Sequence, residues 1–514
     1  MMIMVISDGE AQGAFMTYLT ALAMRPLYMV LVPLFASILI FVIGRFVSYC
    51  SEILEILAAS FAAVGGVSLL SAVLAGEELS TGIITTGSSP LLTFSPDYAG
   101  ATFAAVISVL WLLVSVYSAG CTIRLDKPAS SVIHGASSLS MGAVFSLCFA
   151  ADLMTFFTAL VVLMAASYPL VFCGSSNSRA KSLIRYYSAV AAAAVMLGMS
   201  YKMIVTACGK QDFVLGGYVS DGTLTGNECL TAFVLMVLPG MLCAGLITLH
   251  RWIPETMTAE HPADAVMHSL TLANAGAFTV IRALLYIFGQ ENVRDCGGMK
   301  FLVYAAVFTI IAAGLTSLGE PLIRGRVAFT IPAQVSAVIL GACIISPFGI
   351  TGTMIFLSAT AVSRAAICMA AGALTYDTGA NDIAGLPGSA KHSPLSVLAF
   401  AAATFAAAGL PFTGNFAGIV NIFYGGIAAG KPFLLAMIAL SSLFIAACLG
   451  QVIFASFGKG DGAKRESRAG FLIFIPVIMC VIFAFVLGIK PDAIFRLRET
   501  AMMLGNSLFN PLMK

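Results

Sequence analysis

The stretch SVLAFAAATFAAAGLPFTGNFAGIVNIFYG, residues 396–425, determines how this chain must fold. It is apolar over more than the roughly 20 residues that a membrane-spanning helix needs, yet Gly409-Leu410-Pro411 and Gly414 stand in its middle. Proline removes a backbone hydrogen bond and clashes with the preceding turn. In hydrocarbon the freed carbonyls need partners, so such a break is tolerated inside a bundle or beside a wet cavity. The stretch therefore predicts a broken helix in the interior of a membrane bundle.

A second apolar stretch, residues 229–249, carries the same kind of interruption at Pro239-Gly240, followed by Gly245. Paired broken helices in matching halves of a chain point to a transport site, although each interruption alone is equally compatible with an ordinary kink. In all, about fourteen stretches are long and apolar enough to span a membrane, so we expect an all-α integral membrane protein. They are residues 27–45, 53–74, 99–120, 133–151, 153–173, 184–207, 229–249, 266–287, 300–319, 328–346, 350–374, 396–425, 432–456 and 470–489.

The two interrupted helices are the seventh and the twelfth, and this spacing of five is what two five-helix repeats would produce. Helices 4–8 (133–287) and 9–13 (300–456) form these repeats within a core of residues 133–456. Residues 1–132 hold the first three helices, and residues 457–514 hold helix 14 and a tail. The polar stretches 75–98, 208–228 and 375–395 contain Gly, Ser, Thr and Asp and are expected to be loops.

The composition excludes several classes of protein. Of the 514 residues, 60% are hydrophobic and 10% charged, whereas soluble domains carry about 25% charged residues. The net charge of +2 is spread thinly, so no nucleic-acid partner is expected. The 12 cysteines show neither a CxxC nor a Cys/His spacing, which argues against a metal site or a disulfide framework. No haem, flavin, nucleotide or iron-sulfur motif is present, so we expect no cofactor and no redox centre in this chain.

The distribution of positive charge predicts the orientation in the membrane. Loops after odd-numbered helices hold 14 Lys and Arg, whereas the loops on the other side hold 5 before the C-terminal tail, which adds 4. By the positive-inside rule, the odd-numbered loops face the cytoplasm of a cell membrane. Both termini are then on the non-cytoplasmic side.

Several ordered sequence strings resemble one family of membrane proteins. The chain is similar to the membrane subunits shared by proton-translocating NADH-quinone oxidoreductases and Mrp cation/proton antiporters, and two strings, Ser167-Tyr-Pro-Leu-Val171 and Leu285-Tyr-Ile-Phe-Gly289, favour the Mrp D-type branch. The resemblance covers roughly residues 94–490. It is carried by Trp111–Ser118, Asp152–Phe157, Ala166–Val171, Leu249–Pro254, Pro262–His268, Ala275-Gly276, Ile281-Arg282, Tyr286–Gly289, Ala328–Gln334, Asp382–Leu386, Pro394-Leu395, Gly409–Pro411 and Ser441–Leu443.

The resemblance implies that the two five-helix repeats are inverted and that a buried relay of Glu, Lys and His crosses the membrane middle. Most of this relay is missing here. The family's glutamate on helix 5 falls on Val161, and its lysines on helices 7 and 8 fall on Cys243 and Asn274. The charged position on helix 12 falls near Gly418. On helix 11, Arg364 stands where the family has lysine, and arginine does not release its proton.

Five polar residues remain as candidates for an ion path. Asp264 and His268 are four residues apart on helix 8, on one face with Thr271, Thr279 and Arg282; a residual proton path and a packing histidine are the two interpretations. Arg364 needs a partner inside the bundle, for which we predict a polar side chain or carbonyls of broken helix 12. Lys202 either snorkels to the interface or replaces the missing lysine of helix 7. His250, at the turn after helix 7, either takes up protons or caps the turn.

Three functions remain open from the sequence. The first is a membrane subunit of a multisubunit monovalent cation/proton antiporter, or of a related NADH-quinone oxidoreductase. Its partners would be other membrane subunits, lipid, protons and, in the antiporter, Na⁺. The second is a structural or assembly subunit that kept the fold and lost the pump, as the replaced relay positions suggest. The third, weaker hypothesis is a stand-alone solute transporter.

Overall fold

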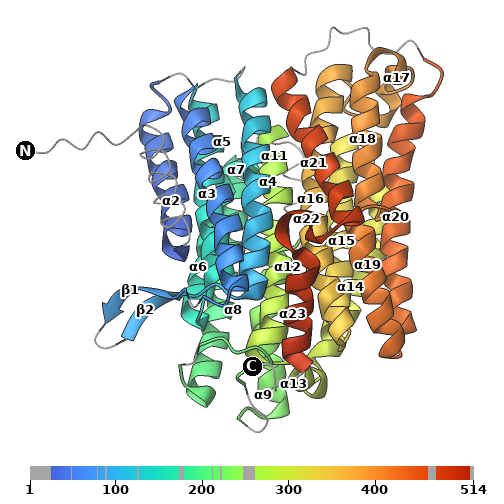
Figure 1. Ribbon diagram of the computed structural model, residues 1–514. Helices are drawn as coiled ribbons and strands as arrows, with labels where there is room; N and C mark the ends of the chain where they lie inside the picture. Colours follow the sequence, from blue (N-terminus) through green and yellow to red (C-terminus); the bar gives the residue numbers. More distant parts are fainter. Residues whose placement is uncertain are drawn as a thin grey trace, which may run out of the picture.

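The computed structural model describes residues 25–47, 49–77, 79–86, 89–123, 127–172, 179–210, 212–219, 223–246, 261–460 and 470–509. Within these residues, 13 helices are long and apolar enough to cross a membrane. Pro394–Ala407 and Gly414–Ala428 form the two halves of the remaining predicted span. The predicted all-α membrane architecture is therefore confirmed, and Figure 1 shows the helices running side by side in one bundle.

The predicted spans and the observed helices agree closely. The helices of the first half of the chain are α2 (Pro26–Ile43), α3 (Cys50–Leu74), α4 (Tyr98–Thr122), α5 (Lys127–Phe149), α6 (Leu153–Ala166), α7 (Tyr168–Phe172), α8 (Arg179–Cys208) and α9 (Gly226–Cys243). Helix 8 comprises α11 (His261–Ser269), α12 (Leu272–Arg282) and the π-helix η1 (Ala283–Ile287). The second half contains α13 (Gln290–Asp295), α14 (Gly298–Gly319), α15 (Ile323–Ala342), α16 (Pro347–Thr378), η2 (Ile383–Gly385), α17 (Ser389–His392), α18 (Pro394–Ala407), α19 (Gly414–Ala428), α20 (Pro432–Ser456), α21 (Phe471–Ile489), α22 (Asp492–Phe495) and α23 (Leu497–Phe509).

Two regions contain more structure than predicted. The expected loop 75–98 contains a β-hairpin of β1 (Thr81–Thr86) and β2 (Ser89–Phe94), which pair antiparallel. Its Thr, Ile and Leu residues favour extended backbone. In the tail, α23 packs against α4 and α16, and the hydroxyl of Thr351 donates to the carbonyl of Ala501 at 3.2 Å. The hairpin lies at the lower end of the bundle in Figure 1, and we call this end the hairpin side and the other end the opposite side.

Each repeat contains an equivalent contact between two loops, and the two contacts lie on opposite sides of the bundle. In the first repeat, Asp152 before α6 forms an antiparallel bridge with Asp212 between α8 and α9. In the second, Leu322 before α15 forms one with Asp382 after α16. The partners in the second pair are displaced by five helices from those in the first. Displacement by an odd number of membrane crossings places the second bridge on the other side, as an inverted repeat requires.

Both broken helices end their first half in the same way. Gly245 follows α9 with φ +70° and Gly409 follows α18 with φ +70°. In each, the next residue donates its amide to a carbonyl five residues back, Leu246 to Met241 at 3.0 Å and Leu410 to Phe405 at 3.3 Å. These are Schellman motifs, in which a left-handed glycine ends a helix.

The interruption of helix 7 was predicted at the wrong place, because Pro239 and Gly240 lie inside α9, which continues to Cys243. Gly240 instead allows close helix packing. A Cβ added at Gly240 would lie 2.9 Å from the side chain of Thr279 on α12. At Gly409 and Pro411 the predicted break is confirmed, because both lie between α18 and α19. Helix 8 contains an additional interruption at Leu270 and Thr271, where Thr271 has φ −105° and ψ −100°.

The second half of helix 12, α19, lies unusually close to α16. A Cβ added at Gly418 would lie 2.7 Å from the backbone nitrogen and Cα of Phe356, and one added at Gly352 would lie 2.5 Å from the amide nitrogen of Ile422. Real Cβ atoms do not occupy such positions. The backbone of α16 therefore fills the space beside Gly418, near which the sequence resemblance would place a charged side chain on helix 12.

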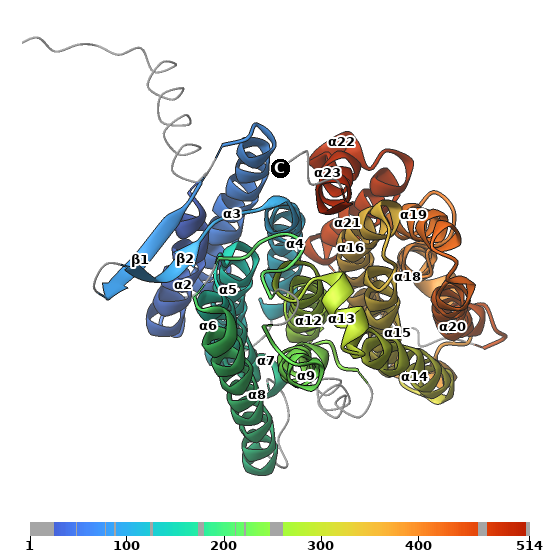
Figure 2. The same cartoon turned by 90° about the horizontal axis from the view of Figure 1, so that it is seen from below.

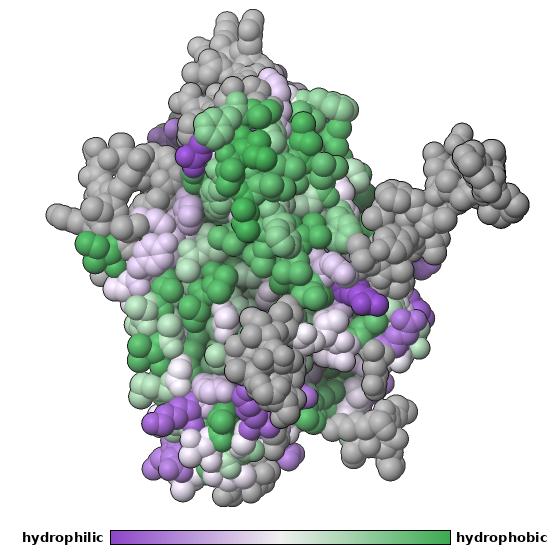
Figure 3. Space-filling model, turned by 90° about the vertical axis from the view of Figure 1, so that its left-hand side faces the viewer, coloured by the Kyte–Doolittle hydropathy of each residue, from purple (hydrophilic) through white to green (hydrophobic). Residues whose placement is uncertain are grey.

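The outer faces of the bundle are apolar. On α2, for example, Phe35, Ile38 and Val42 are about 60% exposed. Figure 3, which views the side bearing α2 and the hairpin, shows hydrophobic residues over much of the bundle and polar residues gathered toward the hairpin end. Because water would penalise this much exposed apolar surface, these faces must meet lipid or other membrane subunits.

We expect Gly418→Val to destabilise the protein, because overpacking a tight contact costs about 1–3 kcal/mol. The measurement is the fraction of purified protein that remains monodisperse in detergent after heating. Gly198→Val is the matched control, since Gly198 lies in the membrane helix α8 and a Cβ there would meet nothing within 4 Å. Equal heat resistance of the two variants would contradict the tight contact between α16 and α19.

Candidate proton path along helix 8

Helix 8 is the polar axis of the bundle. The whole segment Pro262–Ile287 is buried, and polar side chains recur along it from Asp264 to Arg282. These 18 steps span about 27 Å at 1.5 Å per residue, close to the roughly 30 Å thickness of the hydrocarbon layer. The buried polar residues are Asp264, His268, Ser269, Thr271, Asn274, Thr279 and Arg282.

On the opposite side, Asp264 lies between a histidine and an arginine. One oxygen, Oδ1, is 3.1 Å from Nε2 of His268, and the other, Oδ2, is 3.3 Å from Nη2 of Arg324 on α15. The side chain of His268 is 1% exposed, and those of Asp264 and Arg324 are 12% and 15% exposed. The structure thus brings the two predicted residues together and adds Arg324, which in the sequence is one of several loop charges. The aspartate side chain retains a narrow connection to the outside, whereas the imidazole lies inside.

On the hairpin side, Arg282 closes the other end of the axis. Its guanidinium binds Asp97 in a bidentate pair, with Nη1–Oδ2 at 2.9 Å and Nη2–Oδ1 at 2.5 Å, and Nη2 also donates to the carbonyl of Cys148 at 2.9 Å. Its Cζ lies 4.4 Å from the ring centroid of Tyr286. The side chain of Arg282 is 2% exposed and that of Asp97 is 28% exposed. The buried cation is therefore neutralised by an anion that still reaches water.

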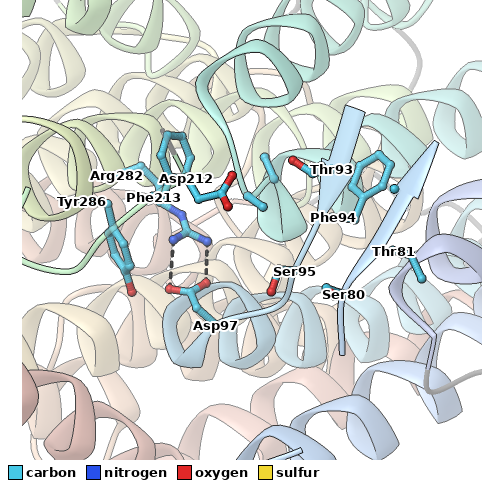
Figure 4. Close-up of a pocket in the computed structure, with 13 residues that line it drawn as sticks. Ser80, Thr81, Thr93, Phe94, Ser95, Asp97, Asp212, Phe213, Arg282 and Tyr286 are labelled. Atoms are coloured by element: carbon cyan, nitrogen blue, oxygen red, sulfur yellow. Dashed lines mark hydrogen bonds and ion pairs between the residues drawn. The ribbon is translucent and has the colours of Figure 1, made fainter. Parts of the chain in front are cut away.

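A cavity of about 370 Å³ opens beside this ion pair, lined by residues of the hairpin, the segment before α4, the loop between α5 and α6, the loop before α9, α12 and η1. Figure 4 shows the guanidinium of Arg282 pointing to Asp97, with Tyr286 on one side and Asp212 nearby. From the sequence, Arg282 was expected on the polar face of helix 8, but Asp97 was not identified. Asp97 caps α4 by accepting from the amide of Gly100 at 3.0 Å, so its position before an apolar run was the available signal.

The middle of helix 8 is polar but does not titrate. Thr271 donates to the carbonyl of Met267 at 3.3 Å, and the amide of Asn274 donates to the carbonyl of Ser269. Both partners lie in α11, so these bonds satisfy carbonyls released by the interruption before α12. The side-chain oxygen of Asn274, Oδ1, has no hydrogen-bond partner among the described residues. An unpaired buried acceptor can hold a water molecule where space allows.

Arg364 is the third charged group of the interior. Its side chain is fully buried; Nε donates to Oε1 of Gln334 at 2.9 Å and Nη2 to Oγ1 of Thr360 at 3.1 Å. Gln334 in turn donates to the carbonyl of Ala407, where helix 12 breaks, at 3.2 Å. The predicted polar partner of Arg364 is thus Gln334. Among the described residues, no carboxylate oxygen lies within 4 Å of Arg364.

The helix that carries Arg364, α16, packs against α11, which carries Asp264 and His268, and also touches α12. The charged group at the opposite end of helix 8 and the arginine of α16 therefore belong to one region of the interior. Figure 2 shows α12 and α16 next to each other, and α4 lies beside both.

The remaining sequence candidates for an ion path are Lys202 and His250. Lys202 is exposed on α8, and His250 lies outside the described residues. Of the positions aligned with the family relay, Val161 is half-buried, Cys243 and Asn274 are buried, and Gly418 lies against Phe356. The observed polar axis thus uses helix 8 and its neighbours rather than the family positions on helices 5, 7 and 12.

The sequence profile of the NADH:quinone oxidoreductase/Mrp antiporter transmembrane family matches residues 150–445. The chain belongs to this family. Among curated proteins, it is 22% identical to the D-type component of the Na⁺/H⁺ antiporter of Bacillus subtilis over 492 residues, which cover 94% of this chain and 96% of that protein. This family member therefore spans nearly the full length of that relative.

Solved structures show the same fold. A chain of the Mrp complex from Dietzia sp. DQ12-45-1b superposes with a TM-score of 0.79 at 20% identity, covering 95% of this chain and 98% of that one. A chain of respiratory complex I from Thermus thermophilus superposes with a TM-score of 0.76 at 18% identity, covering 94% and 100%. At such low identity the similarity concerns the fold. It confirms the family fold that the sequence strings implied.

We expect Asp97→Ala to lower the stability of the protein, because it leaves Arg282 buried without its anion. Breaking a buried ion pair costs about 3–5 kcal/mol, and the partial exposure of Asp97 favours the lower end. Asp295→Ala is the control, because Asp295 pairs with Arg294 at the surface, where the side chains are 63% and 56% exposed and solvent screens the pair. The measurement is the midpoint of thermal aggregation in detergent. Similar midpoints for both variants would contradict the structural role of Asp97.

Proposed function

We propose that this chain is a membrane subunit of a multisubunit monovalent cation/proton antiporter, in which it conducts protons along helix 8. The observation that carries the proposal is the buried polar axis with an ion pair at each end and a histidine beside one of them. Ionisable groups in membrane-spanning segments are costly and mark ion pathways. The name of the Bacillus subtilis relative, which describes part of a Na⁺/H⁺ antiporter, supports a cation/proton exchange function.

The proposed path starts at Asp264 and His268. An imidazole can accept a proton at one nitrogen and release one from the other, and its charge changes in the physiological pH range. The 3.1 Å contact between Asp264 and His268 lets a proton pass between the carboxylate and the imidazole, while the guanidinium of Arg324 holds the other carboxylate oxygen at 3.3 Å. The polar middle of helix 8 would carry the proton onward through water, because Thr271 and Asn274 hydrogen-bond but do not titrate.

Arg364 takes an electrostatic role in this proposal. The family relay has a lysine at this position, as the sequence resemblance implies, whereas arginine stays protonated. A fixed positive charge beside the path would raise the energy of a proton passing it. The proton flux therefore depends on how well Gln334 and Thr360, which accept hydrogen bonds from the guanidinium, offset its fixed charge.

A non-pumping structural subunit is the second candidate function. The observation that favours it is the contact between Gly418 and Phe356, because this contact leaves no space for a charged side chain at position 418 of helix 12. Together with Val161 and Cys243, it leaves three positions without the charged groups that the resemblance implies. Such a subunit would support the assembly of the complex without conducting protons.

The orientation follows from the charge distribution of the loops. We propose that the side bearing Asp264 faces the cytoplasm of a cell membrane and that the hairpin side faces outward, with both termini on the outer side. The loops near Asp264 are those that follow odd-numbered helices and carry most of the Lys and Arg. Under this orientation, His268 receives protons from the cytoplasm and the cavity beside Asp97 opens to the exterior.

We expect His268→Gln to reduce Na⁺-driven proton movement by about tenfold or more, because a positioned proton-transfer group contributes about 100-fold or more to a rate. The measurement is the dequenching of a pH-sensitive dye on addition of Na⁺ to everted vesicles that contain the complete complex. His392→Gln is the matched control, since His392 lies on the same side and is exposed. Unchanged flux in His268→Gln, with the complex assembled, would favour the non-pumping subunit.

We expect the tagged protein, purified from native membranes in mild detergent, to carry other membrane subunits in stoichiometric amounts. The apolar outer faces, such as that of α2, are surfaces on which such subunits can pack. Mass spectrometry of the purified complex identifies them. Small membrane subunits without flavin or iron-sulfur proteins would support the antiporter, peripheral redox subunits would place the chain in an electron-transfer complex, and a lone chain would contradict both.

A further inference from the structure

The N-terminal helices contain a second buried group of titratable residues, which lies outside the family-matched segment 150–445. Glu52 and Glu55 on α3 and His134 on α5 are 8%, 1% and 0% exposed. Thr122, at the end of α4, lies between them and is 1% exposed. We call these four residues the N-terminal cluster.

The inner half of the cluster is centred on Glu55. Its Oε1 accepts from the indole Nε1 of Trp111 at 2.9 Å and from the hydroxyl of Ser137 at 2.5 Å. Its Oε2 is hydrogen-bonded to Nδ1 of His134. Both carboxylate oxygens are thus engaged by N–H or O–H groups from α4 and α5. An imidazole bonded in this way is held in one orientation, with Nδ1 toward the glutamate.

The outer half of the cluster is centred on Glu52. The other nitrogen of His134, Nε2, lies 2.8 Å from Oγ1 of Thr122, and that hydroxyl lies 3.3 Å from Oε1 of Glu52. The hydroxyl of Ser130 also donates to Oε1 of Glu52, at 2.7 Å. The two carboxylates are therefore connected through Thr122 and His134. The hydroxyl of Thr122, which also lies 2.9 Å from the carbonyl oxygen of Ser118, donates its single hydrogen to one of these partners at a time.

The charge of this cluster points to bound protons. With a neutral imidazole the two carboxylates would leave two negative charges in the interior, where uncompensated charge is costly. Among the described residues, His134 is the cationic group that comes within 4 Å of either carboxylate. The turn between α2 and α3, at the end of α3 that carries Glu52, holds the exposed Arg45 and Tyr49, and the side chains of Arg124 and Lys127 lie outside the described part. The helices packed against the cluster also carry weaker acids. These weaker acids are Tyr28 on α2, Cys50 on α3, Tyr98, Tyr117 and Cys121 on α4, and Cys148 on α5.

We propose that the N-terminal cluster is a proton-binding site that stores an exchangeable proton near the opposite side of the membrane. In the loading step, a protonated Glu52 gives its proton to Oγ1 of Thr122. The hydroxyl gives its own hydrogen to Nε2 of His134, and the imidazolium then gives its Nδ1 proton to Oε2 of Glu55. Each step breaks one bond to hydrogen and forms another. The net change is the transfer of one proton from Glu52 to Glu55, together with a shift of the imidazole hydrogen of His134 from Nδ1 to Nε2.

The geometry favours a proton over a metal cation at this site. An indole N–H and two hydroxyls point their hydrogens at the carboxylate oxygens, and a cation at those oxygens would be repelled by them. The series of hydrogen-bonded groups also reaches the outside at one end only, at Glu52. The side chain of Glu52 is 10% exposed and that of Glu55 is 1% exposed, and the indole of Trp111 beyond Glu55 can only donate. The site therefore holds a proton rather than conducting it through.

The cluster also lies beside the axis of helix 8. The helix that carries Thr122, α4, also packs against α11 of helix 8, and Figure 2 shows α4 between α3 and α5 on one flank and the helix 8 region on the other. A stored proton on the N-terminal cluster would raise the local positive potential near Asp264. This storage does not depend on transport along helix 8 and can be tested in the isolated chain.

The first test is infrared difference spectroscopy of the full-length protein in lipid, cycled between mildly acidic and mildly alkaline buffer. We expect a carbonyl band of a protonated carboxylic acid that shifts in D₂O and is lost in Glu55→Gln. Glu77→Gln is the control, because Glu77 is exposed beyond the other end of α3. Identical carboxylic-acid bands in Glu55→Gln and the parent protein would overturn the proposal.

The second test distinguishes the effect of losing the Thr122 hydroxyl from the effect of altered packing. It can also be done if Glu55→Gln does not fold. Thr122→Val removes the hydroxyl at similar volume, whereas Thr122→Ser keeps it. After a pH jump, we expect the carboxylic-acid band to appear at least about tenfold more slowly in Thr122→Val than in the parent protein, since a positioned proton carrier contributes at least that much to a proton-transfer rate. We expect Thr122→Ser to follow the parent protein. Equal rates in both variants would overturn the path through Thr122.

Discussion

The structure depends on the rule that polar backbone groups inside a membrane must find partners within the protein. Where helix 12 breaks, the carbonyls of Ala406 and Ala407 lose their helical partners. The amide of Asn415, from the second half of the same helix, donates to Ala406 at 3.0 Å, and Gln334 donates to Ala407 at 3.2 Å. Because the side-chain oxygen of Gln334 binds Arg364, the break, the amide groups and the buried cation stabilise one another.

The same rule explains which parts of the fold the sequence could predict. A run of apolar residues long enough to cross hydrocarbon leaves few alternatives, so the spans agreed to within a few residues. The break at Gly409 was also predictable, because glycine and proline together interrupt a helix. At Pro239 this reasoning failed, since a proline can remain within a helix while a left-handed glycine six residues later, Gly245, ends it. The interruption at Thr271 has neither glycine nor proline beside it, so no local signal announced it.

The partners of the charged residues were harder to predict than the residues themselves. Asp264 and His268 lie four apart on one helix, so their contact follows from helical periodicity. Arg324 and Asp97 reach helix 8 from 60 and 185 residues away, and single-sequence patterns carry no information on such pairings. Glu52 and Glu55 did carry a signal, because two carboxylates at the start of an apolar run are costly to bury, but we did not interpret it from the sequence alone.

The contact between α16 and α19 has a consequence for how this branch of the family can vary. Because position 418 has no space beyond a hydrogen atom beside Phe356, a charged residue cannot be introduced there while α16 keeps its present course. Neighbouring positions in the same seam, Gly352 with Ile422 and Gly425 with Gly349, impose the same restriction. Substitutions on the two helices must therefore accumulate together, and these positions should covary among homologues as a set.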